Sequence, residues 1–117
     1  MTCQDNHKTL KVDRGTTPGW YLRVTRNGSA EDITGWTVYF TVKEHMQDTD
    51  ADALIAKDII AHVNPTGGIT VVELTSSETD RIGSFYYDIK VKDNEGKSWI
   101  IARGRIKFQA TVTQRGI

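Results

Sequence analysis

Cysteine is almost absent from the sequence: Cys3 is its single cysteine, so an intramolecular disulfide is excluded. This fits a protein that is made and kept in a reducing compartment. The amino-terminal residues also lack the apolar stretch that a signal peptide needs, and no window approaches the length of a membrane-spanning helix. We therefore expect synthesis in the cytoplasm of the producing cell and no membrane partner.

An excess of either charge sign is absent as well. The 117 residues include 15 Lys and Arg against 15 Asp and Glu, which gives a formal net charge of zero. Proteins that bind nucleic acid normally carry a basic excess that displaces counterions from phosphate. We therefore expect no nucleic-acid partner, and a net charge of zero does not oppose the self-association of copies.

A complete metal-binding pattern is missing too. Asp48, Asp50 and Asp52 are spaced like the first three ligands of a calcium loop. Ala53 and Ile59, however, stand where such a loop needs a glycine and a bidentate glutamate. This mismatch favours a solvated acidic loop, and we expect no bound metal.

The other candidates for chemistry are isolated. His7, His45 and His62 are far apart and lack a paired ligand spacing, so we interpret them as polar surface histidines. Cys3 lies in a polar terminal segment without the helix start that activates a nucleophilic thiol. Gly67-Gly68 is too short for a loop that cradles phosphate. We therefore expect no cofactor and no catalytic residue, and we predict that the protein is not an enzyme.

What the sequence does contain is alternation with a period of two, which predicts strands with one buried face. Four runs alternate clearly, with these residues expected inward: Trp20, Leu22 and Val24; Trp36, Val38, Phe40 and Val42; Phe85, Tyr87, Ile89 and Val91; Ile106, Phe108, Ala110 and Val112. Three further strands are expected, at 54–63, at 69–74 and from about residue 97.

Turn signals separate these runs. Asn27-Gly28 predicts a tight hairpin turn because both residues tolerate positive φ, and residues 93–96 predict a second turn. The segment from Thr75 to Glu78 has a capping-box pattern, which predicts a single helical turn ended by Gly83. Residues 44–53 are polar and acidic and predict a mobile loop.

The pattern as a whole predicts an all-β fold, an immunoglobulin-like antiparallel β-sandwich of about seven strands. We expect residues 1–8 to be a flexible amino-terminal segment and residues 9–117 to form one sandwich domain. Phe85 stands where such domains often carry a corner tyrosine, and the cysteine pair of antibody domains is absent. The likeness is therefore to the architecture and not to antibodies.

Aromatic residues on the outward parity are the candidate binding residues. Tyr21, Tyr39 and Tyr86 alternate with inward residues of their strands, whereas the side of Trp99 is left open by the pattern. Aromatic residues are enriched at protein interfaces, so these three tyrosines are a possible interface. A row of outward tyrosines is also compatible with the binding of carbohydrate or of a host surface, which is the alternative function.

One family resemblance spans nearly the whole chain from about Thr9. The run 32–43 resembles the segment after the first hairpin in small β-sandwich domains of tailed-phage and prophage structural proteins. The likeness continues through 68–75, 83–89 and 93–96, and it ends at 102–104. The named relative that it suggests is the amino-terminal domain of upper baseplate proteins.

This resemblance implies a role without catalysis. It suggests a virion protein of the baseplate, the tail or the head–tail region, made in the cytoplasm of a bacterial host. The implied partners are further copies of the chain as a homo-oligomer, other phage structural proteins, or both. The implied mechanism is assembly, in which symmetry multiplies modest contacts between sheet edges or faces.

Overall fold

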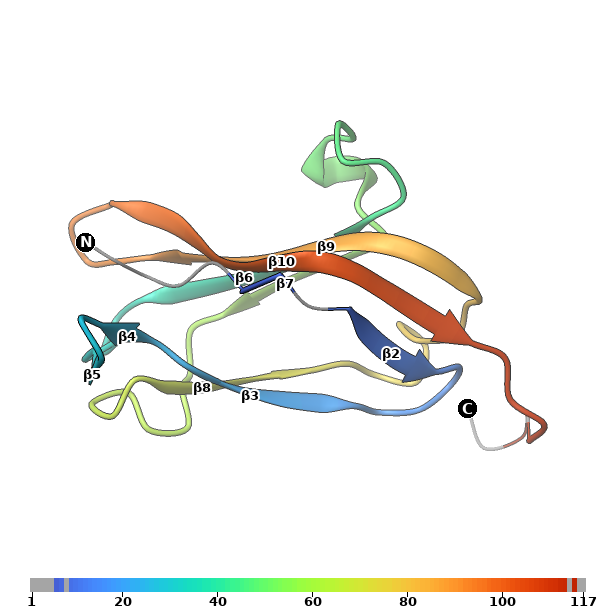
Figure 1. Ribbon diagram of the computed structural model, residues 1–117, viewed down its shortest axis with the longest axis horizontal. Helices are drawn as coiled ribbons and strands as arrows, with labels where there is room; N and C mark the ends of the chain where they lie inside the picture. The colour runs from blue at the N-terminus through green and yellow to red at the C-terminus, as the bar shows by residue number, and fades with distance from the viewer. Residues whose placement is uncertain (1–5, 8, 114, 116–117) are drawn as a thin grey trace.

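Two layers of strands face each other in the computed structural model, which describes residues 6, 7, 9–113 and 115 (Figure 1). One layer is a sheet with the order β1–β10–β9–β6–β7, in which β2 also pairs with β10. Its strands are β1 (Asn6–His7), β2 (Leu10–Asp13), β6 (Thr37–Lys43), β7 (Ile55–Ile59), β9 (Gly83–Lys92) and β10 (Ser98–Gln109). We call it the large sheet.

The second layer, the small sheet, pairs β3 (Gly19–Arg23) with β8 (Ile69–Glu73). The hairpin of β4 (Thr25–Arg26) and β5 (Ser29–Ala30) follows β3. The 3-10 turn η1 (Asp50–Asp52) belongs to the loop between β6 and β7, which stands on the outer side of the large sheet (Figure 1).

Alternating burial along the central strands explains why the layers stack. On β6 the side chains of Val38, Phe40 and Val42 are fully buried, whereas Thr37 and Tyr39 lie on the outer face. β9 has the same parity from residue 87 to residue 91. The predicted register of these two strands is therefore confirmed, because a shift by one residue would have exchanged the two faces.

The topology confirms an all-β sandwich. β6, β9 and β10 lie in one layer, as strands C, F and G do in an immunoglobulin-like sandwich. β3 and β8 lie in the other layer, as strands B and E do. Seven of the described strands have four or more residues. The pairing differs from the prediction in one respect: β1 and β2 run parallel to β10, whereas all other pairs are antiparallel.

The number of strands of four or more residues agrees with the prediction, although two strand assignments near the ends of the chain are wrong. The strands expected near residue 97 and at Ile106 are one continuous strand, β10, while β2 was not predicted at all. β10 ends at Gln109, so the expected inward positions of Ala110 and Val112 are wrong. Both side chains are exposed, and Val112 is fully so.

Polar side chains close one flank of the sandwich, between β7 and β8. The Lys57 ammonium donates to the Glu73 carbonyl at 2.6 Å and to Glu78 Oε1 at 2.8 Å. His62 Nε2 lies 2.8 Å from the Trp36 carbonyl oxygen, which can only accept, so Nε2 carries the proton. His62 Nδ1 lies 2.9 Å from the Thr70 hydroxyl, so this half-buried histidine joins the two layers. Its interpretation as an ordinary surface histidine is wrong.

The predicted turns are present. Asn27 and Gly28 both have positive φ, 52° and 80°, in the turn between β4 and β5. Thr75 and Glu78 make the reciprocal hydrogen bonds of a capping box, 2.8 Å and 3.3 Å long, and the Thr79 amide closes one helical turn. Gly83 does not end that turn as predicted, because it is the first residue of β9.

The amino-terminal segment falls partly outside the described residues. Asn6 and His7 pair with Ala102 and Arg103 of β10 as the short strand β1. Cys3 lies outside the described residues.

Candidate interaction surfaces

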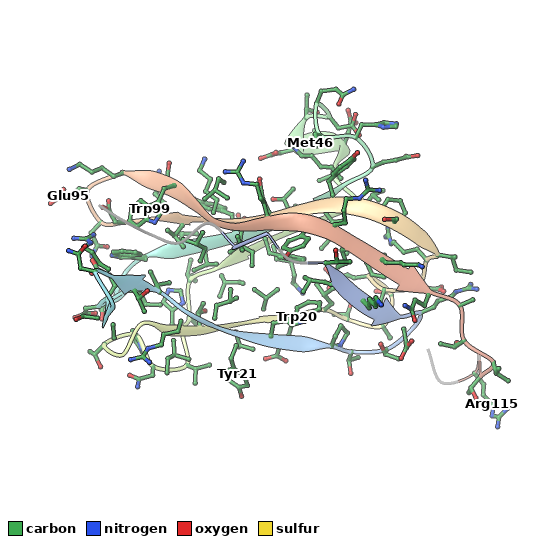
Figure 2. All side chains as sticks on the ribbon, in the orientation of Figure 1. Trp20, Tyr21, Met46, Glu95, Trp99 and Arg115 are labelled. Carbon is green, nitrogen blue, oxygen red and sulfur yellow. The ribbon has the colours of Figure 1, made fainter. Side chains whose placement is uncertain are left out.

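The three outward tyrosines lie on two different surfaces. Tyr39 on β6 and Tyr86 on β9 belong to the outer face of the large sheet and are half-buried. Tyr21 on β3 belongs to the outer face of the small sheet and is 75% exposed. Figure 2 shows it directed away from the sandwich, opposite to Trp20. The structure therefore does not bring the three together.

Tyr39 and Tyr86 are also separated along their shared face. Tyr39 pairs with Lys90 of β9, four residues from Tyr86, which corresponds to about 13 Å along a strand. The guanidinium of Arg105 lies 4.2 Å from the centre of the Tyr86 ring and donates to the Ser84 hydroxyl. One face of the Tyr86 ring is thus already occupied by a cation.

Charged residues surround these tyrosines. Asp88 lies between them on β9, and burial raises the pKa of its carboxyl, although Lys43 and Arg103 act in the opposite direction. Lys43 binds Asp50 of the β6–β7 loop at 2.8 Å, and this hydrogen bond lowers the pKa of Asp50. Basic residues outnumber acidic ones on the outer face. Most of its exposed cations lie on β9 and β10: Lys90, Lys92, Arg103, Arg105 and Lys107.

The acidic triad of the β6–β7 loop is engaged locally. Asp48 accepts a hydrogen bond from the His45 amide, Asp50 pairs with Lys43, and Asp52 accepts from the Thr49 hydroxyl. The described part of the chain contains no cluster of three or more His, Cys, Asp or Glu side chains that could hold a metal ion.

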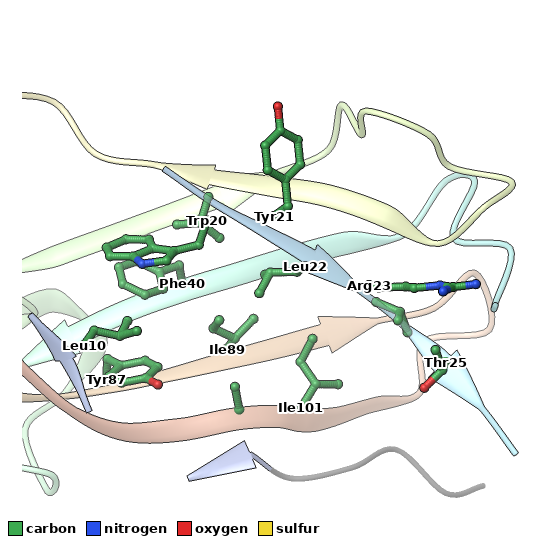
Figure 3. A pocket seen from close by; sticks show the side chains of 13 residues that line it. Leu10, Trp20, Tyr21, Leu22, Arg23, Thr25, Phe40, Tyr87, Ile89 and Ile101 are labelled. Carbon is green, nitrogen blue, oxygen red and sulfur yellow. The ribbon is translucent and has the colours of Figure 1, made fainter. Parts of the chain in front are cut away.

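A groove opens on the flank opposite to Lys57 and His62, between β3 and the β2–β10 edge of the large sheet. It has a volume of about 270 Å³. Figure 3 shows side chains of both layers gathered in it, with Tyr21 pointing away from the others. The lining residues are Leu10, Trp20, Tyr21, Leu22, Arg23, Val24, Thr25, Phe40, Val72, Tyr87, Ile89, Ile101 and Ala102.

The groove explains an irregularity in the burial of β3. Trp20 and Leu22 point inward like Phe40 on β6, yet they are only half-buried, whereas Phe40 is fully buried. The Trp20 ring still packs on Phe40, with ring centres 6.1 Å apart. Apolar side chains of the sandwich interior are thus accessible from this flank. Arg23 is the one charged residue among the described lining residues.

One edge of β3, beside this groove, has no partner among the described strands. Among the described strands β3 pairs only with β8, and the register matches Trp20 with Val72 and Leu22 with Thr70. Bonds from the Val24 amide to the Gly68 carbonyl and from the Leu74 amide to the Pro18 carbonyl fix which pairs are hydrogen-bonded. Hydrogen-bonded and non-bonded pairs alternate in an antiparallel ladder.

It follows that the even-numbered residues of β3 direct their backbone groups to β8. The odd-numbered residues Gly19, Tyr21 and Arg23 direct theirs to the opposite, free edge. The alternation of residues in the sequence predicted the outward side of Tyr21, but it predicted neither this edge nor the groove. Both depend on which strands lie side by side, and alternation within one strand carries no such signal.

Among the described residues, no helix is long and apolar enough to cross a membrane. No protein-family model and no curated protein matches the chain.

Solved structures do match, and the N-terminal domain of phage TP901-1 ORF48 is one of them. It has a TM-score of 0.58 and 9% sequence identity, with 91% of this chain and 90% of that chain covered. At such low identity the likeness concerns the fold alone. In fold, this chain is similar to a domain of a phage protein over nearly the full length of both.

Proposed function

We propose that this protein is a structural component of a phage or prophage particle and acts by protein–protein assembly, without catalysis. The observation that carries the proposal is the likeness in fold to the N-terminal domain of phage TP901-1 ORF48, which extends over 91% of the chain. Fold alone does not fix function, so the proposal also uses the sequence resemblance to phage structural domains.

The features of the surface agree with assembly. Within the part of the chain that the structure describes, β3 has an edge with unpaired backbone groups beside an open apolar groove, and the large sheet has a separate basic face. Unpaired edges and accessible apolar surface are where proteins join neighbours. We propose that the partners are further copies of the chain, other particle proteins, or both.

The finer assignment rests on the sequence resemblance to upper baseplate proteins. On that basis we propose the baseplate, or another part of the tail or the head–tail region, as the location in the virion. Synthesis is proposed to occur in the cytoplasm of the bacterial host.

The alternative function, carbohydrate or host-surface binding, has less support from the arrangement of the tyrosines. A sugar-binding platform needs aromatic faces that are close together and open to solvent. Tyr21 lies on the opposite layer from Tyr39 and Tyr86, and Arg105 covers one face of Tyr86.

Two measurements test the proposal. Light scattering over a wide concentration range should detect an oligomer, and pull-down against the proteins of the same gene cluster should capture a particle protein. A control variant, Tyr39→Ala with Tyr86→Ala, should keep these interactions. A strictly monomeric protein that captures none of them, yet binds a glycan through Tyr39 or Tyr86, would establish the alternative.

A further inference from the structure

The free edge of β3 has the properties of a site that accepts one more strand. Gly19, Tyr21 and Arg23 direct their backbone N–H and C=O groups to this edge, and the groove lies directly beside it. An added strand would satisfy these groups, while its alternate side chains would enter the groove. The opposite flank offers no such opening, because Lys57 and His62 bridge the layers there.

The chain itself contains a segment with the matching chemistry. Directly after β10, residues 110–113 alternate two apolar with two hydroxyl side chains and include the β-branched residues that strands favour. Ala110 is exposed and Val112 is fully exposed. Within this segment the Thr111 hydroxyl donates a local hydrogen bond to the Thr113 carbonyl at 2.7 Å. The segment is thus patterned as a strand without being paired as one.

From these two observations we infer that residues 110–113 of a second copy add as a strand to the free edge of β3. This inference rests on the assembly role proposed above and names the partner and the contact. Val112 of the second copy enters the groove, and the local bond of Thr111 opens as the segment straightens.

The parity of the two segments is compatible. The backbone groups at the free edge belong to Tyr21 and Arg23, whose side chains face outward. In an antiparallel pairing the residues opposite them are also outward-facing, which suits Thr111 and Thr113. Val112 then lies on the inward side with Leu22, where the groove provides apolar contacts.

Such a contact is heterologous, because the donor segment and the acceptor edge are different surfaces of the same chain. Each copy can therefore donate to one neighbour and accept from another. Repetition gives a ring when the rotation between neighbours closes and an open filament when it does not.

Two single substitutions separate donor from acceptor. Val112→Asp places a carboxylate where an apolar side chain enters the groove, and it should weaken self-association by at least about tenfold. Tyr21→Pro removes the N–H that faces the free edge and leaves the bonds to β8 intact, which edge strands tolerate. It should weaken self-association to a similar extent. Thr113→Asp is the matched control, because the same charge on the outward side should leave association unchanged.

Mixing the two variants gives the sharpest readout. The Val112→Asp chain retains its acceptor edge and the Tyr21→Pro chain retains its donor segment. Each alone should sediment as a monomer, whereas their mixture should form a one-to-one complex and nothing larger. Circular dichroism and thermal unfolding check that both variants remain folded. A synthetic peptide of residues 109–115 should bind the Val112→Asp chain, and the peptide with the same Asp substitution should not.

The outcomes distinguish this inference from the proposed function. Wild-type oligomers that persist in both variants would overturn the strand addition while leaving assembly through another surface in place. A wild-type chain that is monomeric and does not bind the peptide, but captures a particle protein, would also overturn the strand addition alone. A monomer that captures no particle protein counts against both.

Discussion

Two glycines with positive φ, Gly68 and Gly28, differ in how closely other backbone atoms approach them. Gly68 precedes β8 with a φ of +74°, and a Cβ at this position would lie 2.6 Å from the carbonyl oxygens of both Val24 and Glu31. Gly28 has a similar φ of +80°, but a Cβ there would meet nothing within 4 Å. The two glycines therefore share the conformational requirement and differ in the space around them.

We predict that Gly68→Ala costs at least about 2 kcal/mol of unfolding free energy, from left-handed backbone strain together with the collision with two backbone oxygens. Gly28→Ala should cost about 1 kcal/mol, from the strain alone. Denaturant unfolding of both variants measures the difference. Equal costs would show that the close approach at Gly68 contributes nothing to stability.

Glu78 is the residue whose ionisation we expect to matter for folding. Burial acts to raise the pKa of its carboxyl, but hydrogen bonds from Lys57 and the Thr75 amide outweigh burial, so the pKa lies below its ordinary value of 4.5. A lowered pKa means that the ionised form stabilises the folded state above pH 4.5. This contribution is lost as the pH falls through 4.5 towards the lower pKa of the folded protein.

We predict that Glu78→Gln lowers the unfolding free energy by about 0.5–1 kcal/mol at pH 7, because glutamine can cap the turn but cannot pair with the Lys57 charge. The difference from the wild type should shrink as the pH is lowered below 4.5. Glu95→Gln is the control, since Glu95 is well exposed and lies 3.5 Å from Lys97. A difference that stays constant with pH would contradict the assigned role of the Glu78 charge.

At the scale of the elements, the inward face of β6 and the residue before it anchor the core. Trp36 is buried, its ring meets the Trp99 ring edge-on at 5.3 Å, and its carbonyl accepts the His62 bond. Thr37, the next residue, lies on the outer face.

We predict that Trp36→Ala costs about 3–5 kcal/mol, the usual range for the truncation of a buried tryptophan. Thr37→Ala should cost far less, because its side chain is removed from the outer face. Denaturant unfolding of the two variants tests the register. Similar losses at both positions would mean that the inward and outward faces of β6 are exchanged.

Strands with an unbroken alternation could be predicted from the sequence, whereas the interrupted strand β10 was predicted as two strands and the four-residue strand β2 was missed. β6 and β9 carry long alternating runs, so both their existence and their inward faces were correct. In β10 the register shifts between Ile100 and Ala102. The shift changes the parity of the inward residues, so one strand looks like two in the sequence. Ile101 and Ala102 are both buried as a result.

β2 was not predicted from the sequence, for a different reason. It has four residues, with only Leu10 and Val12 inward, and its partner is the far end of the chain through a parallel pairing with β10. No local turn signal in the sequence indicates a parallel pairing between distant segments. The groove could not be predicted for the same reason, since it lies between β3 and strands distant from it in the sequence.

At the scale of the whole molecule, the two flanks of the sandwich differ. The β7–β8 flank is closed by the Lys57 and His62 hydrogen bonds. The β3 flank is open, with half-buried Trp20 and Leu22 beside a strand edge that has no partner among the described residues. The core is therefore well packed, while one edge of the described sandwich has room for a further strand. This asymmetry agrees with the assembly role proposed above, which rests first on the likeness in fold.

The protein composition of purified particles is the decisive measurement for the proposed assembly role. Particles released by cells that carry this gene can be separated on a density gradient, and their proteins quantified by mass spectrometry. We predict that this chain sediments with the particles, in a fixed copy ratio to the other structural proteins, and that high salt washes do not change this ratio. If the chain is absent from intact particles and all of it is recovered in the soluble fraction, the proposed role is wrong.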